Sequence, residues 1–250
     1  MPVLLEVWGK HALFTRPELK IERVSYDVLT PSAARGILEA IYWKPRIEWI
    51  IQKIHVINRI QFQNIRRNEV SYKGDTPFKI EDKRTQRTSM VLKDVRYVID
   101  ARFRVLEDDE LEEKAKRFKW NLDKVSEKER EADKKPEKHL EIFERRAGNG
   151  QAHKQPVFGC REFPVYFDLL EIREEGLLKH KIDFWKKNLK EEELNSTQDC
   201  PIWLEGTHDL GWMVWDLNFV NAEKFTPRMF RAEMKNGVII TDPTKVEVKG

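Results

Sequence analysis

A tyrosine and a lysine–histidine pair have the side chains that acid–base chemistry on a phosphate requires. Tyr42 lies at the end of an apolar helical pattern, and Lys138 and His139 fall in the first turn of a second predicted helix. Backbone N–H groups and the positive end of the helix dipole at such a turn favour a bound phosphate. The dipole disfavours an imidazolium whereas a phosphate favours it, so we expect the His139 pKa near neutrality, as a proton shuttle needs.

Ordinary structural roles explain the same residues without any chemistry. A histidine beside a lysine on a polar helix face is more often plain surface, and a tyrosine can simply close the apolar face of its helix. Composition does not decide between these interpretations. The chemistry therefore depends on whether the fold brings the exit of the first helix and the entrance of the second together.

Clustered basic residues are candidates for contacts with a polyanion. Two pairs of adjacent arginines, a group within residues 83–87 and a glycine-containing loop after residue 148 carry them. Such clusters suit phosphate contacts, although they also occur on ordinary solvated faces. The candidates are Arg66, Arg67, Arg84, Arg87, Arg145, Arg146, His153 and Lys154.

The composition indicates a protein with a substantial core. The chain has 250 residues, of which 40% are hydrophobic and 36% charged, and its formal net charge is +3. No apolar run reaches the roughly 20 residues of a membrane-spanning helix, and the N-terminus lacks a secretory pattern. Cys160 and Cys200 are far apart in the sequence, so we expect neither a disulfide framework nor a structural zinc site. With so few cysteines we expect a cytoplasmic location.

Sequence motifs for metal or cofactor binding are missing. The histidines and carboxylates show no metal-ligand spacing, and no nucleotide-binding glycine loop occurs. A dedicated metal centre or nucleotide cofactor therefore has no support in the sequence.

Capping signals define the two helices that would hold the three residues. Thr30 can cap the first helix and Pro31 fits its first position, while Pro45 disfavours helical geometry at the residue before it. The first helix should therefore end near the tyrosine. The second helix should begin at Pro136, and Gly148 is expected to end it in a left-handed conformation.

Alternating apolar residues predict the strands around these helices. Between residues 95 and 103 apolar side chains occupy one face and mostly basic side chains the other, a shape that RNA-binding ferredoxin-like domains use. Residues 71–88 have few apolar positions and are expected to form a long mobile loop. The expected strands span residues 3–8, 47–57 with a bend at Gln52, 60–70, 90–105 and 162–171.

The order of these elements predicts the fold class, which is α+β. Up to residue 172 the order is β-α-β-β-α-β, the split βαβ arrangement of a ferredoxin-like fold. A charge-dense insert at residues 107–135 is expected to form a solvated helical excursion. We therefore predict a ferredoxin-like domain at residues 1–172.

The remaining residues, 173–250, are expected to form a C-terminal antiparallel β-sheet extension. A polar stretch up to residue 199 contains one short amphipathic piece near residue 184. An aromatic strand is expected at residues 211–219. Asn236 and Gly237 between apolar runs predict a hairpin at residues 229–240.

Motifs distributed over nearly the whole chain are together characteristic of one family. They are A-L-F-T-R-P-E at 12–18, S-Y-D-V-L-T-P-S-A-A-R-G-I-L-E-A-I-Y-W-K-P at 25–45, I-R-R-N-E at 65–69, K-H at 138–139 followed by F-E-R-R at 143–146, G-C-R-E-F at 159–163, D-L-G-W-M at 209–213 and F-R-A-x-M-x-N-G-V at 230–238. With these motifs the chain resembles the CRISPR-associated Cas-five proteins of the D subtype, from type I-C systems. Two departures are a long charged insert and a lysine at 135, where asparagine is common.

The resemblance implies a fold, an activity and a site. The fold is an RRM-like domain of the RAMP superfamily, and the activity is metal-independent cleavage of precursor CRISPR RNA in the repeat hairpin. The adjacent 2′-OH would attack the phosphate and leave a 2′,3′-cyclic phosphate. Tyr42, Lys138 and His139 match the family's catalytic residues, with Lys138 stabilising charge on the phosphorane. Whether His139 is the base or the acid stays open, and so does whether Tyr42 positions the 2′-OH or shares the proton transfer. Trp43 and Lys44 are open between packing and RNA contact.

The resemblance also implies partners and leaves two alternatives. The protein would stay on the 5′ handle of the guide within the type I-C Cascade, beside a Cas-seven backbone and a Cas-eight large subunit. The alternatives are a non-catalytic subunit that binds the 5′ handle and a metal-dependent DNA nuclease. The catalytic interpretation makes one geometric prediction, which is that Tyr42 and His139 lie close together.

Overall fold

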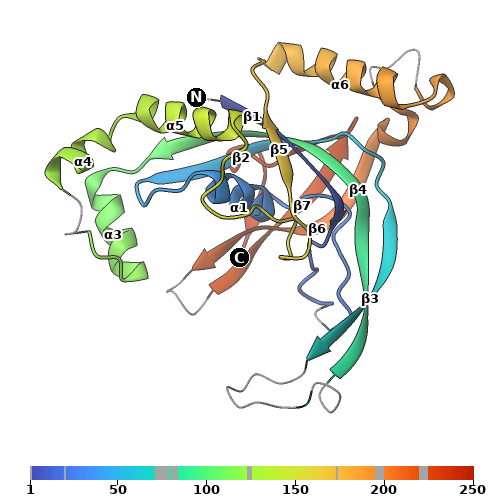
Figure 1. Ribbon diagram of the computed structural model, residues 1–250, viewed down its shortest axis with the longest axis horizontal. Coiled ribbons are helices and arrows are strands. Elements are labelled where there is room, and N and C mark those ends of the chain that lie inside the picture. Colours follow the sequence, from blue (N-terminus) through green and yellow to red (C-terminus); the bar gives the residue numbers. More distant parts are fainter. Residues whose placement is uncertain are drawn as a thin grey trace.

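One antiparallel sheet of nine strands organises the protein (Figure 1). This computed structural model describes residues 2–19, 21–70, 79, 84–122, 126–172, 174–194, 200–219 and 225–250. Seven strands follow the order β5-β1-β4-β2-β8-β7-β6, while β3 pairs with β4 and β9 with β7. The strands are β1 (Pro2–Ala12), β2 (Ile47–Val56), β3 (Phe62–Val70), β4 (Arg84–Val105), β5 (Tyr166–Leu169), β6 (Thr207–Phe219), β7 (Phe225–Lys235), β8 (Val238–Ile240) and β9 (Val248–Lys249).

Helices lie on both faces of this sheet. They are α1 (Pro31–Ile41), α3 (Asp108–Phe118), α4 (Glu127–Ala132), α5 (Pro136–Gly148) and α6 (Glu174–Asn188), with 3-10 turns at Glu191–Glu193 and Ile202–Leu204. In the chain α1 connects β1 to β2, and α5 lies between β4 and β5. The four strands β5-β1-β4-β2 with these two connections make a mixed α/β unit.

The first helix begins and ends as its sequence predicts. The Thr30 hydroxyl accepts a hydrogen bond from the Ala33 backbone N–H, and Pro31 is the first helical residue. The helix ends at Ile41, and Tyr42 is its extended C-terminal cap. The apolar face formed by Ala34, Ile37, Leu38 and Ile41 is buried. This burial fixes the direction in which the chain leaves the helix.

The second helix begins at Pro136 as predicted, but Gly148 does not end it in a left-handed conformation. Gly148 is still helical, and the residue with positive φ is Gly150 at 65°. The buried positions of this helix are His139, Phe143 and Ala147. The histidine therefore lies on the core side of the helix.

The central strands β2 and β4 confirm the predicted alternation. Val95, Tyr97, Ile99, Ala101 and Phe103 are all buried on one face of β4. The register of β2 against β4 shifts between Ile51 and Lys53, so the predicted bend at Gln52 is a bulge within one continuous strand. The two segments predicted before and after Gln52 therefore form one strand, β2.

The opposite face of β4 is less open than the sequence suggests. Arg96 contacts Glu6 of β1 through an ion pair at 2.9 Å and lies over the ring of Phe184 from α6. His180 of α6 also approaches Glu6, at 3.5 Å. The polar stretch after residue 172, in which only a short amphipathic piece was expected, thus forms a full helix. This helix covers part of the basic face of β4.

The strand β3 and the first part of β4 form a long hairpin (Figure 1). Phe62 pairs with Leu92, and the pairing continues to Val70 opposite Arg84. Residues 84–88, which were expected within a mobile loop, are therefore part of a strand. The rest of the predicted loop at 71–88, apart from residue 79, lies outside the described residues.

The charged insert is helical, as predicted, and its first helix, α3, packs against the rest of the protein. A capping box between Glu107 and Glu110 starts α3, and a second one between Ser126 and Glu129 starts α4. Leu111 and Ala115 are the buried residues of α3. Most of the remaining insert is exposed to solvent.

The C-terminal strands continue the same sheet. The predicted turn is confirmed, because Asn236 and Gly237 have φ of 48° and 74° between β7 and β8. β8 pairs with β2, and Arg35 of α1 forms an ion pair with Asp216 of β6 at 2.6 Å. The division into domains at residues 1–172 and 173–250 stays a prediction. In the described part of the chain no helix is both long and apolar enough to span a membrane.

Candidate active site

The fold brings Tyr42 and His139 into direct contact. The Tyr42 hydroxyl lies 2.8 Å from His139 Nδ1, although the two residues are separated by 97 positions in the sequence. The exposed fractions are 2% for Tyr42 and 0% for His139. The predicted proximity is confirmed, and the alternative in which the histidine is plain surface is wrong.

The partners of the imidazole define its proton arrangement. His139 Nε2 lies 2.7 Å from the backbone carbonyl oxygen of Asp133, which can only accept a hydrogen bond. Nε2 therefore carries the proton. In the neutral ring Nδ1 is then an acceptor, and the Tyr42 hydroxyl donates to it. Both ring nitrogens are thus satisfied inside the protein.

Lys138 and Lys44 approach the same aspartate. Lys138 Nζ donates to Asp133 Oδ1 at 2.7 Å, and Lys44 Nζ lies 3.7 Å from Asp133 Oδ2. The Asp133 side chain is 12% exposed, whereas the side chains of Lys138 and Lys44 are 35% and 43% exposed. The Asp133 carboxylate is therefore held between two ammonium groups, next to the buried Tyr42–His139 pair.

The protonation states follow from burial and from these charges. Desolvation lowers the pKa of His139 below its ordinary value, despite the opposing effect of its contacts with Asp133. Desolvation, together with the Asp133 charge, raises the pKa of Tyr42 to about 12. Burial would raise the pKa of Asp133, but the Lys138 hydrogen bond and the Lys44 charge hold it below its ordinary value. At neutral pH the site holds a neutral histidine, a protonated tyrosine and a carboxylate.

Residues of the core fix the orientation of Tyr42. Trp49 Nε1 donates to the Tyr42 backbone carbonyl oxygen at 3.2 Å. The Arg146 guanidinium lies over the Tyr42 ring, 5.2 Å from its centroid, and donates to the Ile41 carbonyl oxygen at 3.0 Å. Phe103 packs edge-on against His139. The pair is therefore held by α1, α5 and two strands.

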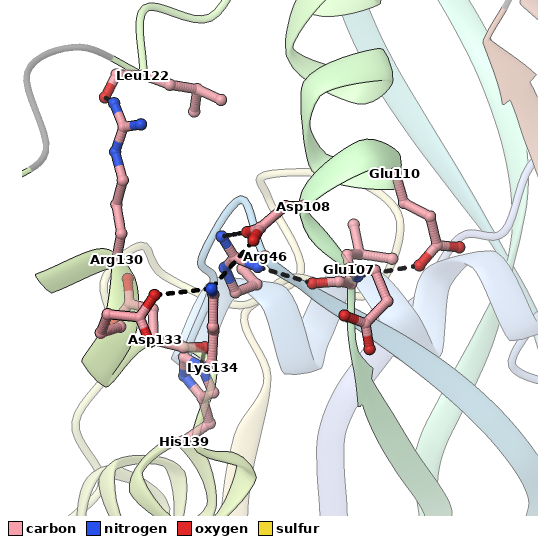
Figure 2. A network of polar contacts seen from close by, with 11 residues as sticks. Arg46, Glu107, Asp108, Glu110, Leu122, Arg130, Asp133, Lys134 and His139 are labelled. Carbon is pink, nitrogen blue, oxygen red and sulfur yellow. Dashed lines mark hydrogen bonds and ion pairs between the residues drawn. The ribbon is translucent and has the colours of Figure 1, made fainter. Parts of the chain in front are cut away.

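A polar network ties the turn between α4 and α5 to the rest of the protein (Figure 2). Arg46 donates to the Leu106 carbonyl oxygen at 2.9 Å and to Asp108 at 2.6 Å. Lys134 contacts the other oxygen of Asp108 at 3.0 Å and Glu131 at 2.7 Å. Because Lys134 follows Asp133 directly, this network holds the aspartate over the histidine.

An open cleft of 1160 Å³ borders the site. It lies between α3, α4 and the residues that follow α1, and Lys44, Asp133 and Lys138 all contribute to its wall. The buried tyrosine and histidine do not line it. In this structure the route from the cleft to His139 Nε2 is therefore closed by Asp133.

Four of the predicted RNA-binding arginines lie together on the β3–β4 hairpin. Arg66 is exposed, and Arg67 pairs across the strands with Arg87. Arg67 forms an ion pair with Glu162, and Arg87 forms one with Glu69 at 3.5 Å. Arg84 is exposed at the start of β4. This hairpin extends away from α5, the helix that carries His139 (Figure 1).

The other four candidates lie around the end of α5. Arg146 contacts Tyr42 as described, whereas Arg145 is exposed. The backbone N–H groups of His153 and Lys154 both donate to the Ala40 carbonyl oxygen, at 2.8 and 3.0 Å, and their side chains are exposed. The eight basic candidates therefore form two separate groups, and only the second adjoins the site.

Sequence reasoning missed two residues of the site and left a third ambiguous. Asp133 and Arg46 carried no recognisable signal, because both are charged residues among many others. Lys44 was ambiguous between packing and RNA contact, although its place two residues after Tyr42 could have drawn attention to it. The contact of Lys44 with Asp133 depends on the turn between α4 and α5, whose position the sequence does not reveal.

The arrangement suits proton transfer beside a bound anion. An imidazole whose Nδ1 is held by a tyrosine can give a proton from Nε2 once the ring is charged, and a nearby phosphate favours the charged form. The two lysines offer positive charge within reach of the same location. Because His139 and both lysines face Asp133, the position of its carboxylate marks where an anionic group is stabilised.

Comparisons with known proteins identify the family. A family profile described as CRISPR-associated protein (Cas_Cas5) matches residues 3–242. A protein of Mannheimia succiniciproducens named CRISPR pre-crRNA endoribonuclease Cas5d is 40% identical over 260 residues, covering 98% of this chain and 96% of that protein. A protein of the same name from Thermus thermophilus is 46% identical over 164 residues, which cover 65% and 62% of the two chains.

Two solved structures have a similar fold. A structure titled "Crystal Structure of CRISPR-associated Protein" has a TM-score of 0.60 and 26% identity, with 96% of this chain and 91% of that chain covered. A functionally uncharacterized protein of Streptococcus mutans shares the fold with a TM-score of 0.62 at 21% identity, covering 100% and 97%. By its profile match and its relatives, the chain belongs to the Cas5d family of CRISPR-associated proteins.

Proposed function

We propose that this protein is an endoribonuclease that cuts precursor CRISPR RNA in the repeat hairpin. The observation that carries the proposal is the contact of Tyr42 with His139, beside Lys138, at a site formed by motifs of the family. The names of the two relatives, which are pre-crRNA endoribonucleases, give the substrate class. We also propose that the reaction needs no metal, because the three residues can supply acid–base and charge-stabilising groups themselves.

In this mechanism the 2′-OH next to the cut site attacks the phosphate and the 5′-oxygen leaves. A bound phosphate favours the imidazolium form of His139, whose Nε2–H gives its proton to the leaving 5′-oxygen while water takes the proton of the attacking 2′-OH. Nδ1 keeps its own proton and donates it to the Tyr42 oxygen, 2.8 Å away. Tyr42 is not a base at neutral pH, since its pKa is about 12, and it acts by orienting the imidazole. Lys138 stabilises the charge that builds on the phosphorane oxygens. The products are a 2′,3′-cyclic phosphate and a 5′-OH.

The fold and the basic groups suit an RNA hairpin. We infer that β1-α1-β2-β4-α5-β5 is a ferredoxin-like, RRM-like domain of the RAMP superfamily, supported by its strand order and its two crossover helices. The arginines of the β3–β4 hairpin would contact phosphates at a distance from the cut, reading shape more than duplex sequence. After cleavage the protein would remain on the 5′ handle with the Cas-seven and Cas-eight subunits of the type I-C Cascade.

Cleavage of cognate repeat RNA in EDTA tests this proposal. The wild type should cut the RNA, and its product should carry a cyclic phosphate. His139→Ala should lower the rate by about 10²- to 10⁴-fold, the usual contribution of a general acid or base. RNA with a 2′-deoxy substitution at the cut site should stay intact, because the nucleophile is missing.

Other results would support the alternative functions. If wild-type and His139→Ala proteins bind the RNA equally and neither cuts it, the protein is a non-catalytic subunit that binds the 5′ handle. If DNA is cut only after divalent ions are added, the metal-dependent nuclease accounts for that activity. Undiminished cutting of the 2′-deoxy RNA would overturn the proposed mechanism.

A further inference from the structure

The carboxylate of Asp133 occupies a position built for an anion. One oxygen accepts from Lys138 at 2.7 Å and the other lies 3.7 Å from Lys44. The two lysines come from different parts of the fold, since Lys44 follows α1 and Lys138 lies in α5. A carboxylate and a phosphodiester both present two anionic oxygens, so a phosphate can take the same two contacts.

The backbone of the same residue blocks the histidine. Its carbonyl oxygen accepts from His139 Nε2 at 2.7 Å, and this nitrogen is the one available for proton transfer. Asp133 therefore makes, within one residue, the charge contacts and the imidazole contact that a reacting phosphate needs. This residue and the two lysines line the neighbouring cleft.

The contacts of Lys44 distinguish it from the many surface lysines of the chain. Its partner is a carboxylate with only 12% exposure, so the pair is partly desolvated. Lys190 forms an ion pair with Glu192 at the same 3.7 Å distance, but their side chains are 80% and 75% exposed. The two ion pairs have the same length, so what sets Lys44 apart is the buried location of its partner beside His139.

We propose that Lys44 and Lys138 form the binding site for the scissile phosphate, and that Asp133 fills this site in the free protein. When RNA binds, the phosphate displaces the carboxylate and the turn between α4 and α5 moves away from His139. Lys44 then becomes a second catalytic lysine. The inference rests on the proposed function, because it assigns the substrate contacts of that same site.

Lys44→Ala tests the new residue. We expect single-turnover cleavage of repeat RNA to fall by about 10- to 100-fold, in line with the loss of one charge-stabilising group. Binding is measured with the 2′-deoxy RNA, which is not cut. The dependence of log K on log salt should become shallower by about one, because one phosphate contact is lost. Lys44→Arg should retain most of the activity.

Asp133→Asn tests the displaced carboxylate. The amide keeps the backbone contact to His139 but removes the charge that competes with RNA. We expect the affinity for the 2′-deoxy RNA to rise several-fold at low salt. Lys190→Ala is the matched control, since it removes a lysine from an exposed pair of the same length. Its cleavage rate and salt dependence should equal those of the wild type.

The outcomes separate this inference from the proposed function. If the wild type cuts the RNA but Lys44→Ala cuts at the same rate with the same salt dependence, Lys44 has no role at the phosphate. If Asp133→Asn binds RNA more weakly, the carboxylate is not a competitor. If the wild type does not cut at all, the proposed function itself fails. Thermal unfolding of each variant excludes misfolding as the cause of a loss.

Discussion

The Tyr42 hydroxyl keeps its proton in the folded protein, and this limits what it can do. Burial and the Asp133 charge raise its pKa to about 12, so in the free protein it donates to Nδ1 of the neutral His139 ring. A donor at Nδ1 fixes the proton of the neutral ring on Nε2. Tyr42 is therefore a positioning residue whose effect passes through the histidine.

Replacement of Tyr42 by Phe tests this role at the scale of one atom. The change leaves Nδ1 buried without a donor, which should cost about 1–3 kcal/mol of unfolding free energy. We expect cleavage to fall by about 10- to 100-fold, while the affinity for 2′-deoxy RNA stays within about threefold of the wild type. The pH dependence of the cleavage rate should also change, because the proton on the imidazole is no longer fixed. Denaturant unfolding, cleavage and binding are measured on the same protein.

Tyr166→Phe is the control for this substitution. Tyr166 is 60% exposed and stacks on Trp8, away from the histidine. Its unfolding free energy and cleavage rate should remain those of the wild type. Equal cleavage by Tyr42→Phe and Tyr166→Phe would contradict a role for the buried hydroxyl.

For single residues, the sequence predicts the catalytic side chains better than it predicts the groups that contact them. Tyr42, Lys138 and His139 were found because they lie in motifs next to helix ends. Asp133 was missed because its importance comes from a backbone carbonyl and a turn, and neither leaves a mark in the sequence. The expectation of a His139 pKa near neutrality considered only the helix dipole and a bound phosphate, whereas desolvation lowers this pKa in the free protein.

Among the elements, the G-C-R-E-F motif has a packing explanation. Gly159 has φ of 81°, and a Cβ atom built on it would lie 2.0 Å from the Leu13 carbonyl oxygen. The Leu13 N–H donates to the neighbouring Phe158 carbonyl oxygen at 3.1 Å, so this loop closes against the end of β1. Only glycine allows so close an approach of two backbones.

Gly159→Ala should therefore destabilise the fold. The clash is with backbone rather than with a flexible side chain, so we expect a loss of several kcal/mol in unfolding free energy, at the severe end for a single substitution. Gly36→Ala is the matched control, because nothing lies within 4 Å of its Cβ position and it is a helical residue of α1. That change should stabilise the protein by about 0.5–1 kcal/mol through helix propensity. Urea unfolding curves measure both, and a Gly159→Ala protein as stable as the wild type would contradict the clash.

The elements themselves were predicted unevenly, for physical reasons. Strong caps and turn residues gave α1, the start of α5 and the turn at Asn236 and Gly237 correctly. The helix α6 was underestimated because a lysine occupies its buried stripe: Leu177, Lys181 and Trp185 are all buried at helical spacing. Burial lowers the Lys181 pKa, and its ammonium lies over the Trp185 ring. A charged residue at a core position weakens the amphipathic pattern on which the prediction depends.

For the molecule as a whole, the pairing of β2 with β8 is decisive. It joins strands separated by about 180 residues into one sheet, and no local pattern in the sequence could predict it. His55 of β2 lies at this junction, opposite Val238. It is 5% exposed, and neither of its ring nitrogens has a hydrogen-bond partner among the residues that the structure describes.

This histidine should make the stability of the molecule sensitive to acid. Desolvation and the nearby Lys181 and Lys53 lower its pKa from 6.5 to about 3. Between these two pH values the unfolded chain binds a proton that the folded chain does not, so the unfolding free energy falls as the pH falls. At pH 4.5 the loss should be about 2–3 kcal/mol relative to pH 7, at roughly 1.4 kcal/mol per pH unit.

His55→Leu should remove this part of the pH dependence. Urea unfolding at pH 7 and pH 4.5 measures it, and the variant should lose about 2–3 kcal/mol less than the wild type between the two pH values. His153→Leu is the comparison, because His153 is exposed and should leave the pH dependence unchanged. Identical pH dependence in wild type and His55→Leu would show that the buried ring does not resist protonation.

Asp133 also has a consequence for selectivity among anions. A carboxylate attached to the site is an intramolecular competitor whose effective concentration can reach the millimolar range or above. Free phosphate or a mononucleotide would have to exceed this concentration to bind. An RNA that is already held elsewhere on the protein has a high effective concentration of its own. The tethered carboxylate would therefore restrict the site to substrates that bind at two places at once.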